Sequence, residues 1–143
     1  MNREGVMQMT DEQLRVKAAE LMGWHWERDK TYKYVTGGSV IGAWVAPKGA
    51  DYPPAFPAPT KDDIRNLPDY FDGIASAWEL FDALVDHGHE PILETYRRKA
   101  SGVRMYAVEV DVGQPVSSRC SPSTGYLDSA PRAITLAFII AMG

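Results

Sequence analysis

The residue types best suited to chemistry are concentrated in the stretch Asp86-His87-Gly88-His89-Glu90. Imidazole and carboxylate groups bind divalent transition metals, so a sharp turn at Gly88 would allow these side chains to share an ion. The spacing matches no established metal motif. The same residues are typical of a helix C-terminus, where histidine complements the helix dipole and glycine takes the left-handed conformation. We therefore favour a helix end here and predict no metal-ligating residues.

The sequence indicates no site for nucleophilic catalysis. Cys120 is the single cysteine, so no internal disulfide is expected, and one thiol with three scattered histidines does not make a structural zinc site of the usual kind. No nucleophile elbow or other local signature of a catalytic triad is found. The sequence favours a protein without catalytic residues or cofactor, in a reducing compartment. A small hydrolase or metal-dependent enzyme using His87, His89 and a carboxylate is an alternative.

The stretch Gly37-Gly38-Ser39-Val40-Ile41-Gly42 has the glycine spacing of a phosphate-binding loop. It fails that motif because Ala43-Trp44 occupies the place of lysine and a hydroxyl residue, and because a strand follows instead of a helix. A hairpin turn is the simpler interpretation. The alternative is a glycine-rich edge whose backbone amides face an anion.

Aromatic and basic side chains gather between residues 24 and 44. Three tryptophans and two tyrosines lie within these twenty-one residues, together with Arg28, Lys30 and Lys33. Such rings commonly form core or cross-strand packing, but rings beside cations also form stacking platforms for nucleobases. A second basic concentration around residues 97–104 is either a solvated turn or a phosphate contact. The candidate ligand-binding residues are Trp24, Trp26, Tyr34, Trp44, Arg97, Arg98 and Arg104.

Acidic residues dominate the stretch 60–90, where eight carboxylates accompany only Lys61 and Arg65. Most simply they form a solvated face. Alternatively they form a surface that binds a basic protein partner. That surface would consist of Asp62, Asp63, Asp69, Asp72, Glu79 and Asp86.

Composition and charge limit the partners. The chain has 143 residues, 45% hydrophobic and 24% charged, which suits one globular domain with a sizeable core. Its 15 basic and 19 acidic residues give a net charge of −4, which disfavours general nucleic-acid binding but not the binding of one small nucleotide. The N-terminus has no apolar signal region, and the most apolar stretch, 133–142, is half the length of the roughly 20 residues in a membrane span. No membrane association is expected.

Periodicity and capping predict the elements that position these residues. Residues 1–8 show no periodicity and are predicted to be a flexible leader, and 9–143 are predicted to form a single domain. Thr10 is a plausible N-cap, and Gln13 occupies the matching position of a capping box. Apolar residues at helical spacing then predict a helix over 11–22.

Strands are predicted next along the chain. Alternating side chains predict a hairpin over 24–34 with its turn near Asp29, and a further strand over 40–45. Residues 46–59 contain five prolines with Tyr52 and Phe56, a density that excludes a helix or a central strand. We expect a long connecting loop that packs its two aromatic rings on the core, with a mobile lid as the alternative.

A second helix is predicted to begin at Asp72 and to end at Gly88. Its acidic residues lie on the outer face. Its apolar residues recur at i, i+4, i+7 and i+11, which places them on one face. That face consists of Ile74, Trp78, Phe81 and Val85.

The remaining pattern predicts a hairpin of strands 92–98 and 103–112, joined at Ala100-Ser101-Gly102. The second strand is apolar on both faces, which indicates that both faces are covered. Residues 116–120 are predicted to add an edge strand.

The last helix, 130–142, has Ser129 or Asp128 as its N-cap and Pro131 in its first turn. It is apolar on nearly every side, so it should be a buried central helix or a contact with a second copy of the chain. We predict an α+β fold with a mostly antiparallel sheet and three helices, of which the C-terminal helix is buried.

Two stretches resemble small bacteriophage proteins of the phage α-β-α (ABA) sandwich domain family and, more distantly, NinX-like phage proteins. They are Leu67-Pro68-Asp69-Tyr70-Phe71-Asp72-Gly73-Ile74-Ala75-Ser76-Ala77-Trp78-Glu79 and Ser129-Ala130-Pro131-Arg132-Ala133-Ile134-Thr135-Leu136-Ala137. The matching residues cap and pack elements, so the resemblance implies a fold and carries no catalytic residues. It implies a three-layer α/β/α sandwich and a phage or prophage protein in the cytoplasm of the infected bacterium.

The sequence and the resemblance together predict a phage accessory protein that binds without catalysis and sequesters a nucleotide-type immune signal of the host. Small phage proteins often counter host defence, so this prediction is an analogy with other phage proteins and does not come from these residues. The alternatives are an inhibitor that binds a host protein through the acidic face, and the small enzyme described above. The expected partners are a small nucleotide or a host protein, with self-association as a further option.

Overall fold

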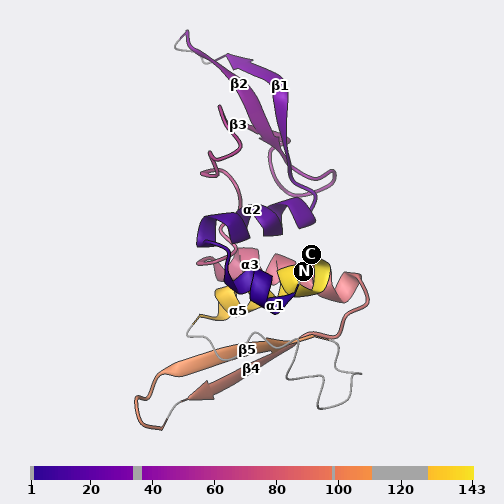
Figure 1. The fold of residues 1–143 in the computed structure, drawn as a ribbon. Coiled ribbons are helices and arrows are strands. Elements are labelled where there is room, and N and C mark those ends of the chain that lie inside the picture. Colours follow the sequence, from indigo (N-terminus) through magenta and orange to yellow (C-terminus); the bar gives the residue numbers. More distant parts are fainter. Residues whose placement is uncertain (1, 34–36, 98, 111–128) are drawn as a thin grey trace. The chain divides into compact units, whose positions relative to one another are not determined.

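The computed structural model describes residues 2–33, 37–97, 99–110 and 129–143. The chain divides into two compact units, unit 1 with Met1–Ala18 and Pro68–Gly143, and unit 2 with Ala19–Leu67. The sequence pattern marks no boundary at these positions, and each unit is described by itself (Figure 1). Helices and strands are mixed, and every strand pair described is antiparallel, as the α+β prediction requires.

Unit 1 begins with the helix α1 (Arg3–Met7), which lies within residues 1–8, a stretch predicted to be a flexible leader. The Asn2 side chain caps it by accepting a hydrogen bond from the Gly5 N–H at 2.8 Å. Val6 is completely buried. A helix of five residues is too short to show a helical period in the sequence, which is why residues 1–8 looked featureless.

The next helix, α2 (Asp11–Leu21), begins and ends close to the predicted 11–22. Its capping box is confirmed, because the Gln13 N–H donates to Thr10 Oγ1 at 3.2 Å while the Thr10 N–H donates to Gln13 Oε1 at 2.9 Å. Two N–H groups that have no partner within the helix are satisfied in this way. The local sequence therefore sets the start of α2.

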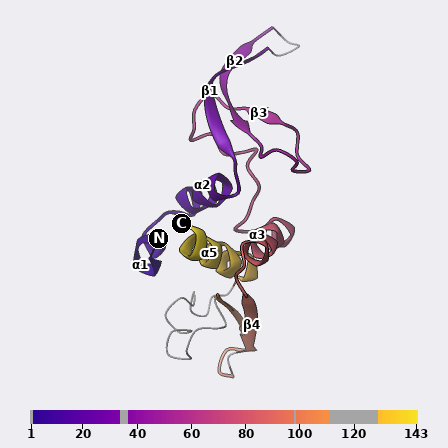
Figure 2. The ribbon, with the colours of Figure 1, turned by 90° about the vertical axis from the view of Figure 1, so that its right-hand side faces the viewer.

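The C-terminal helix α5 (Ala130–Met142) is the central element of unit 1, as predicted. Residues 133–139 are all buried, and α5 packs against α1, α3 and β5. Figure 2 shows α3 alongside α5. Ser129 is confirmed as the N-cap, since its hydroxyl accepts from the Arg132 N–H at 3.3 Å. The other candidate cap, Asp128, lies outside the described residues.

Helix α3 (Ile74–Asp86) departs from the prediction in two respects. Its N-cap is Gly73 and not Asp72, and Gly73 makes no side-chain capping bond. The predicted inner face is also wrong. The buried residues of α3 are Ala77, Leu80 and Leu84, whereas Ile74, Trp78 and Val85 are exposed.

Strands β4 (Ile92–Arg97) and β5 (Arg104–Glu109) form the predicted hairpin. Consecutive residues Ala107 and Val108 lie on opposite faces of β5, and both are buried, which confirms that both faces are covered there. The predicted edge strand 116–120 lies outside the described residues. A three-layer sandwich is not confirmed, because the described strands form two separate sheets.

Unit 2 contains a sheet of three strands in the order β1 (His25–Lys33), β2 (Ser39–Val45) and β3 (Ala55–Pro57). The predicted turn near Asp29 is wrong, because β1 continues through it. An irregularity in the β1–β2 register between Glu27 and Thr31 takes its place. A bulge of this kind interrupts alternation much as a turn does in a sequence pattern.

The proline-rich segment 46–59 packs its two aromatic rings on the core, as predicted. The Trp24 ring lies 5.3 Å from the Tyr52 ring in a T-shaped arrangement and 5.9 Å from the Phe56 ring in a stacked one. The segment also contributes β3, which its prolines restrict to an edge position. Trp44 is completely buried, and its Nε1–H donates to the Asp63 carbonyl at 3.1 Å.

Candidate functional site

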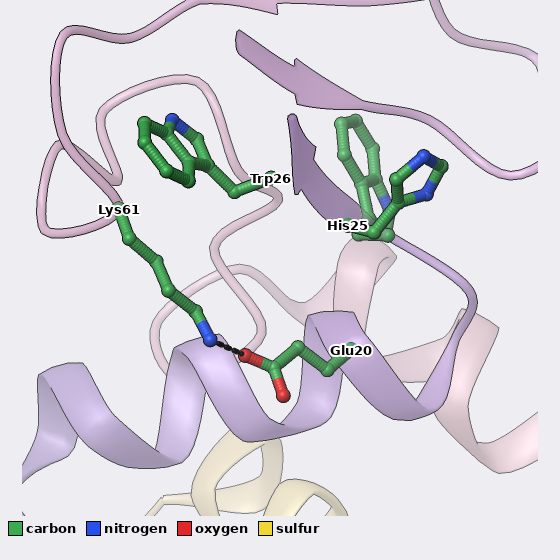
Figure 3. Close-up of a pocket in the computed structure, with 5 residues that line it drawn as sticks. Glu20, His25, Trp26 and Lys61 are labelled. Carbon is green, nitrogen blue, oxygen red and sulfur yellow. Dashed lines mark ion pairs between the residues drawn. The ribbon is translucent and has the colours of Figure 1, made fainter. Parts of the chain in front are cut away.

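Unit 2 contains an open pocket of about 380 Å³, lined by Glu20, Trp24, His25, Trp26 and Lys61. We call it the indole pocket. Figure 3 shows Trp26 and Lys61 on one side, His25 on the other, and Glu20 reaching toward Lys61. Small-molecule sites commonly measure 300–1,000 Å³, are concave and rich in aromatic rings, and carry a few polar groups. The indole pocket lies at the small end of that range.

A helix end and a tight turn place Trp24 in the pocket wall. Helix α2 ends where the Gly23 N–H donates to the Glu20 carbonyl at 3.0 Å and the Trp24 N–H donates to the Ala19 carbonyl at 2.9 Å. Gly23 adopts φ +99°, a conformation that residues with a side chain rarely take. Trp24 is 2% exposed, so it is a rigid wall and not a mobile contact.

Trp26 is the pocket tryptophan whose side chain is partly exposed to solvent. Its indole Nε1–H donates to the Ala58 carbonyl at 3.1 Å, and the side chain is half-buried. A Cβ on Gly42 would lie 2.8 Å from Trp26 Cζ2, so this glycine, with φ +112°, makes room for the indole to approach β2. The hydrogen bond and the missing side chain together hold the ring in one orientation.

The charged groups of the pocket form exposed ion pairs. The Lys61 ammonium lies 2.9 Å from Glu20 Oε1, and the two side chains are 56% and 36% exposed. Exposed pairs of this kind contribute little to stability, so an incoming anion competes easily for the ammonium. His25 Nε2 lies 2.9 Å from Glu27 Oε1 in a second hydrogen-bonded pair. This hydrogen bond, with a smaller contribution from the Lys30 charge, lowers the pKa of the Glu27 carboxyl.

The structure gives the predicted ligand-binding residues different positions. Trp24 and Trp26 line the indole pocket, whereas Trp44 is a core side chain. Arg97 and Arg104 are exposed and face each other across β4 and β5 in unit 1, whereas the three tryptophans belong to unit 2. The two remaining candidates, Tyr34 and Arg98, lie outside the described residues.

Lys61 and Glu20 line the pocket but were not predicted as site residues. They lie far apart in the chain, and each belongs to an ordinary charged segment. No local spacing indicates that they form an ion pair. The one signal available was the position of Glu20 in the last turn of a helix that leads into the tryptophans.

The stretch Asp86-His87-Gly88-His89-Glu90 adopts the predicted helix end. Gly88 has φ +86°, and its N–H donates to the Val85 carbonyl. His87 Nδ1 lies 2.8 Å from the Ala83 carbonyl, which satisfies a carbonyl of the last turn. Among the described residues, no three His, Cys, Asp or Glu side chains gather in a way that would hold a metal ion.

The residues of the proposed acidic face are divided between the two units. Asp62 and Asp63 belong to unit 2, and the other four belong to unit 1. Asp63 is already occupied by Arg65, whose Nε and Nη2 donate to its two oxygens at 2.9 Å each. This pair lowers the pKa of the Asp63 carboxyl.

The chain matches no known family model, no curated protein and no solved structure. In the part of the chain that the structure describes, no helix is long and apolar enough to cross a membrane.

Proposed function

We propose that the chain is a binding module for a small, flat, anionic ligand of the nucleotide class, taken up in the indole pocket. The observation that carries the proposal is the half-buried Trp26 ring, which is fixed by its hydrogen bond to Ala58 and lines the same pocket as Lys61. A ring that is already fixed loses little conformational entropy when a ligand stacks on it.

The ligand class follows from what the pocket offers. Base-on-aromatic stacking contributes about 1–3 kcal/mol per base, and it tolerates any flat heterocycle. The Lys61 ammonium suits a phosphate as a point charge, and it reaches one by leaving Glu20. Because the chain has a net charge of −4, the attraction comes from one local cation, which favours a small ligand over a polymer.

We further propose a role in sequestration, with host immune signals of the nucleotide type as the ligands. This part rests on the resemblance of residues 67–79 and 129–137 to phage proteins. Sequestration requires tight binding and no catalytic group. Two indoles and one ammonium meet that requirement.

The first experiment asks whether the protein carries a ligand out of the cell. The full chain is purified from bacteria shown to produce nucleotide signals, denatured, and examined by mass spectrometry. A nucleotide recovered at close to one per chain is the expected result. Recovery of no small molecule, together with no heat of binding for a panel of mono-, di- and cyclic nucleotides, overturns the proposal.

Matched variants then localise the site. Trp26→Ala should weaken nucleotide binding by about tenfold or more, while Trp26→Phe retains part of it because a ring remains. Lys61→Ala should weaken binding and reduce its salt dependence. Lys48→Ala, an exposed lysine of the same unit outside the pocket, is the control. Equal losses for Lys61→Ala and Lys48→Ala place the ligand elsewhere.

A further inference from the structure

Helix α3 exposes a row of large apolar side chains. Ile74, Trp78 and Val85 are 45%, 41% and 54% exposed, although the helix buries a separate set of small and aliphatic residues. Phe81 is half-buried, and its ring contacts the Trp78 ring at 4.9 Å in a T-shaped arrangement. We call these four residues the α3 stripe.

The α3 stripe is continuous because its members are three or four residues apart, and such residues are neighbours on a helix surface. Single exposed apolar residues are normal in any protein. A row that includes an exposed tryptophan is less common and marks interaction surfaces. The α3 stripe belongs to unit 1, whereas the residues of the indole pocket belong to unit 2.

Carboxylates follow one edge of the α3 stripe. Asp82 is four residues from Trp78 and three from Val85, and Asp86 is four residues further along the same row. Both aspartates are exposed. Residues 66–90 contain no lysine or arginine, so no basic side chain within this stretch offsets the charge.

The positions of these aspartates do not serve the helix itself. Negative side chains stabilise the first turn of a helix and destabilise the last turn, because the helix dipole is positive at its N-terminus. In α3 the first turn has no acidic residue and the last turn has no basic one, while Asp82 and Asp86 lie toward the C-terminal end. The negative charges of Asp82 and Asp86 therefore destabilise α3. Such a placement is expected if these charges act on a partner.

We propose that the α3 stripe is the docking surface for an amphipathic, basic helical segment of a partner protein. The apolar face of such a segment would pack on Trp78 and its neighbours, and lysines or arginines beside that face would meet Asp82 and Asp86. With thirteen residues, α3 is about 20 Å long, enough for roughly three to four turns of a partner helix. The carboxylates also disfavour an anionic lipid surface.

The test uses the full chain and two synthetic helical peptides with identical leucine positions, one carrying lysines and the other glutamates at its polar positions. Isothermal titration should show that the lysine peptide binds and the glutamate peptide does not. Rising salt should weaken the complex. A lysine peptide that binds no more tightly than about 1 mM, or no better than the glutamate peptide, overturns the proposal.

Variants separate docking from general charge attraction. Trp78→Ala and the double variant Asp82→Lys with Asp86→Lys should each weaken lysine-peptide binding by about tenfold or more. The control is Asp51→Lys, a charge reversal at an exposed loop position of unit 2. Circular dichroism shows whether each variant keeps its helix content.

Two outcomes assign the α3 stripe differently and so overturn the proposal. If Asp51→Lys weakens binding as much as the α3 variants, the peptide responds to net charge alone. If sedimentation shows that the full chain dimerises and that Trp78→Ala abolishes the dimer, a second copy of the chain covers the stripe. A monomer that binds the lysine peptide through Trp78 and Asp82 supports the proposal.

Discussion

Replacing Gly42 with alanine should both destabilise unit 2 and disturb the indole pocket. A Cβ at this position would lie 2.6 Å from the Ala58 carbonyl oxygen and 2.8 Å from Trp26 Cζ2, closer than real Cβ contacts. The neighbour on one side is backbone, and on the other it is a ring that is itself hydrogen-bonded to Ala58. Neither gives way without loss of an interaction.

The expected magnitude has two parts. An alanine at φ +112° is strained by about 1–3 kcal/mol. Displacement of the indole breaks the hydrogen bond from Trp26 Nε1 to Ala58, which contributes about 1 kcal/mol. Together they predict a loss of about 3 kcal/mol in the free energy of unfolding, a large part of the 5–15 kcal/mol typical of small domains.

Gly49 provides the matched control in the same unit. It also has a positive φ, +79°, but an added Cβ would meet nothing within 4 Å. Gly49→Ala should therefore show backbone strain alone, about 1–2 kcal/mol. Urea unfolding followed by tryptophan fluorescence and circular dichroism measures both variants. If Gly42→Ala is no less stable than Gly49→Ala within about 0.5 kcal/mol, the argument for a Gly42-dependent seat for Trp26 is refuted.

Three further predictions concern single interactions. Thr135→Val removes a completely buried hydroxyl whose one proton is shared between the Tyr70 carbonyl at 2.7 Å and the Pro131 carbonyl at 2.9 Å, so thermal unfolding should show a loss of about 1–2 kcal/mol, whereas Thr135→Ser should retain most of the stability. Thr10→Ala breaks the capping box of α2 and should cost about 1 kcal/mol; an unchanged urea midpoint would contradict its role. Arg65→Met should return the pKa of Asp63 toward its ordinary 3.8, as carboxyl NMR reports. Because the pair lowers that pKa, its contribution to stability is complete above pH 3.8 and is lost as the pH falls through the lowered value, so the variant should lose less stability on acidification.

Elements with strong local signals were predictable from the sequence. The capping box fixed the start of α2, and the serine and proline at its start fixed α5. The hairpin of β4 and β5 followed from two apolar runs around a turn. Each of these elements is specified by residues that are close in the chain, so a sequence pattern contains the needed information.

The orientation of α3 could not be predicted in the same way. Ile74, Trp78 and Val85 of the predicted inner face are exposed, while the face of Ala77, Leu80 and Leu84 packs inward. Helical periodicity identifies apolar faces but does not say which of two neighbouring faces meets α5. Small residues such as Ala77 allow close packing of helices, and tertiary contact decided the outcome.

The candidate site was predictable in part. Trp24 and Trp26 were identified from their alternation, and both line the indole pocket. Trp44 shares the same pattern, but it is completely buried and its Nε1–H donates to the Asp63 carbonyl. Lys61 was missed because its partner Glu20 is distant in the chain, and such pairs exist only once the chain has folded.

The sheet of unit 2 has two edge strands, β1 and β3, to which an additional strand would be able to pair. The edge strand β3 is three residues long and contains Pro57. Proline has no N–H to donate to another strand. The other edge strand is β1, where the register irregularity coincides with the exposed charged residues Arg28, Asp29 and Lys30. Short length, proline, charge and local twist are the features that keep strand edges from pairing between molecules. The register irregularity, which resembles a turn in the sequence pattern, therefore also disfavours the pairing of β1 with a strand of another molecule.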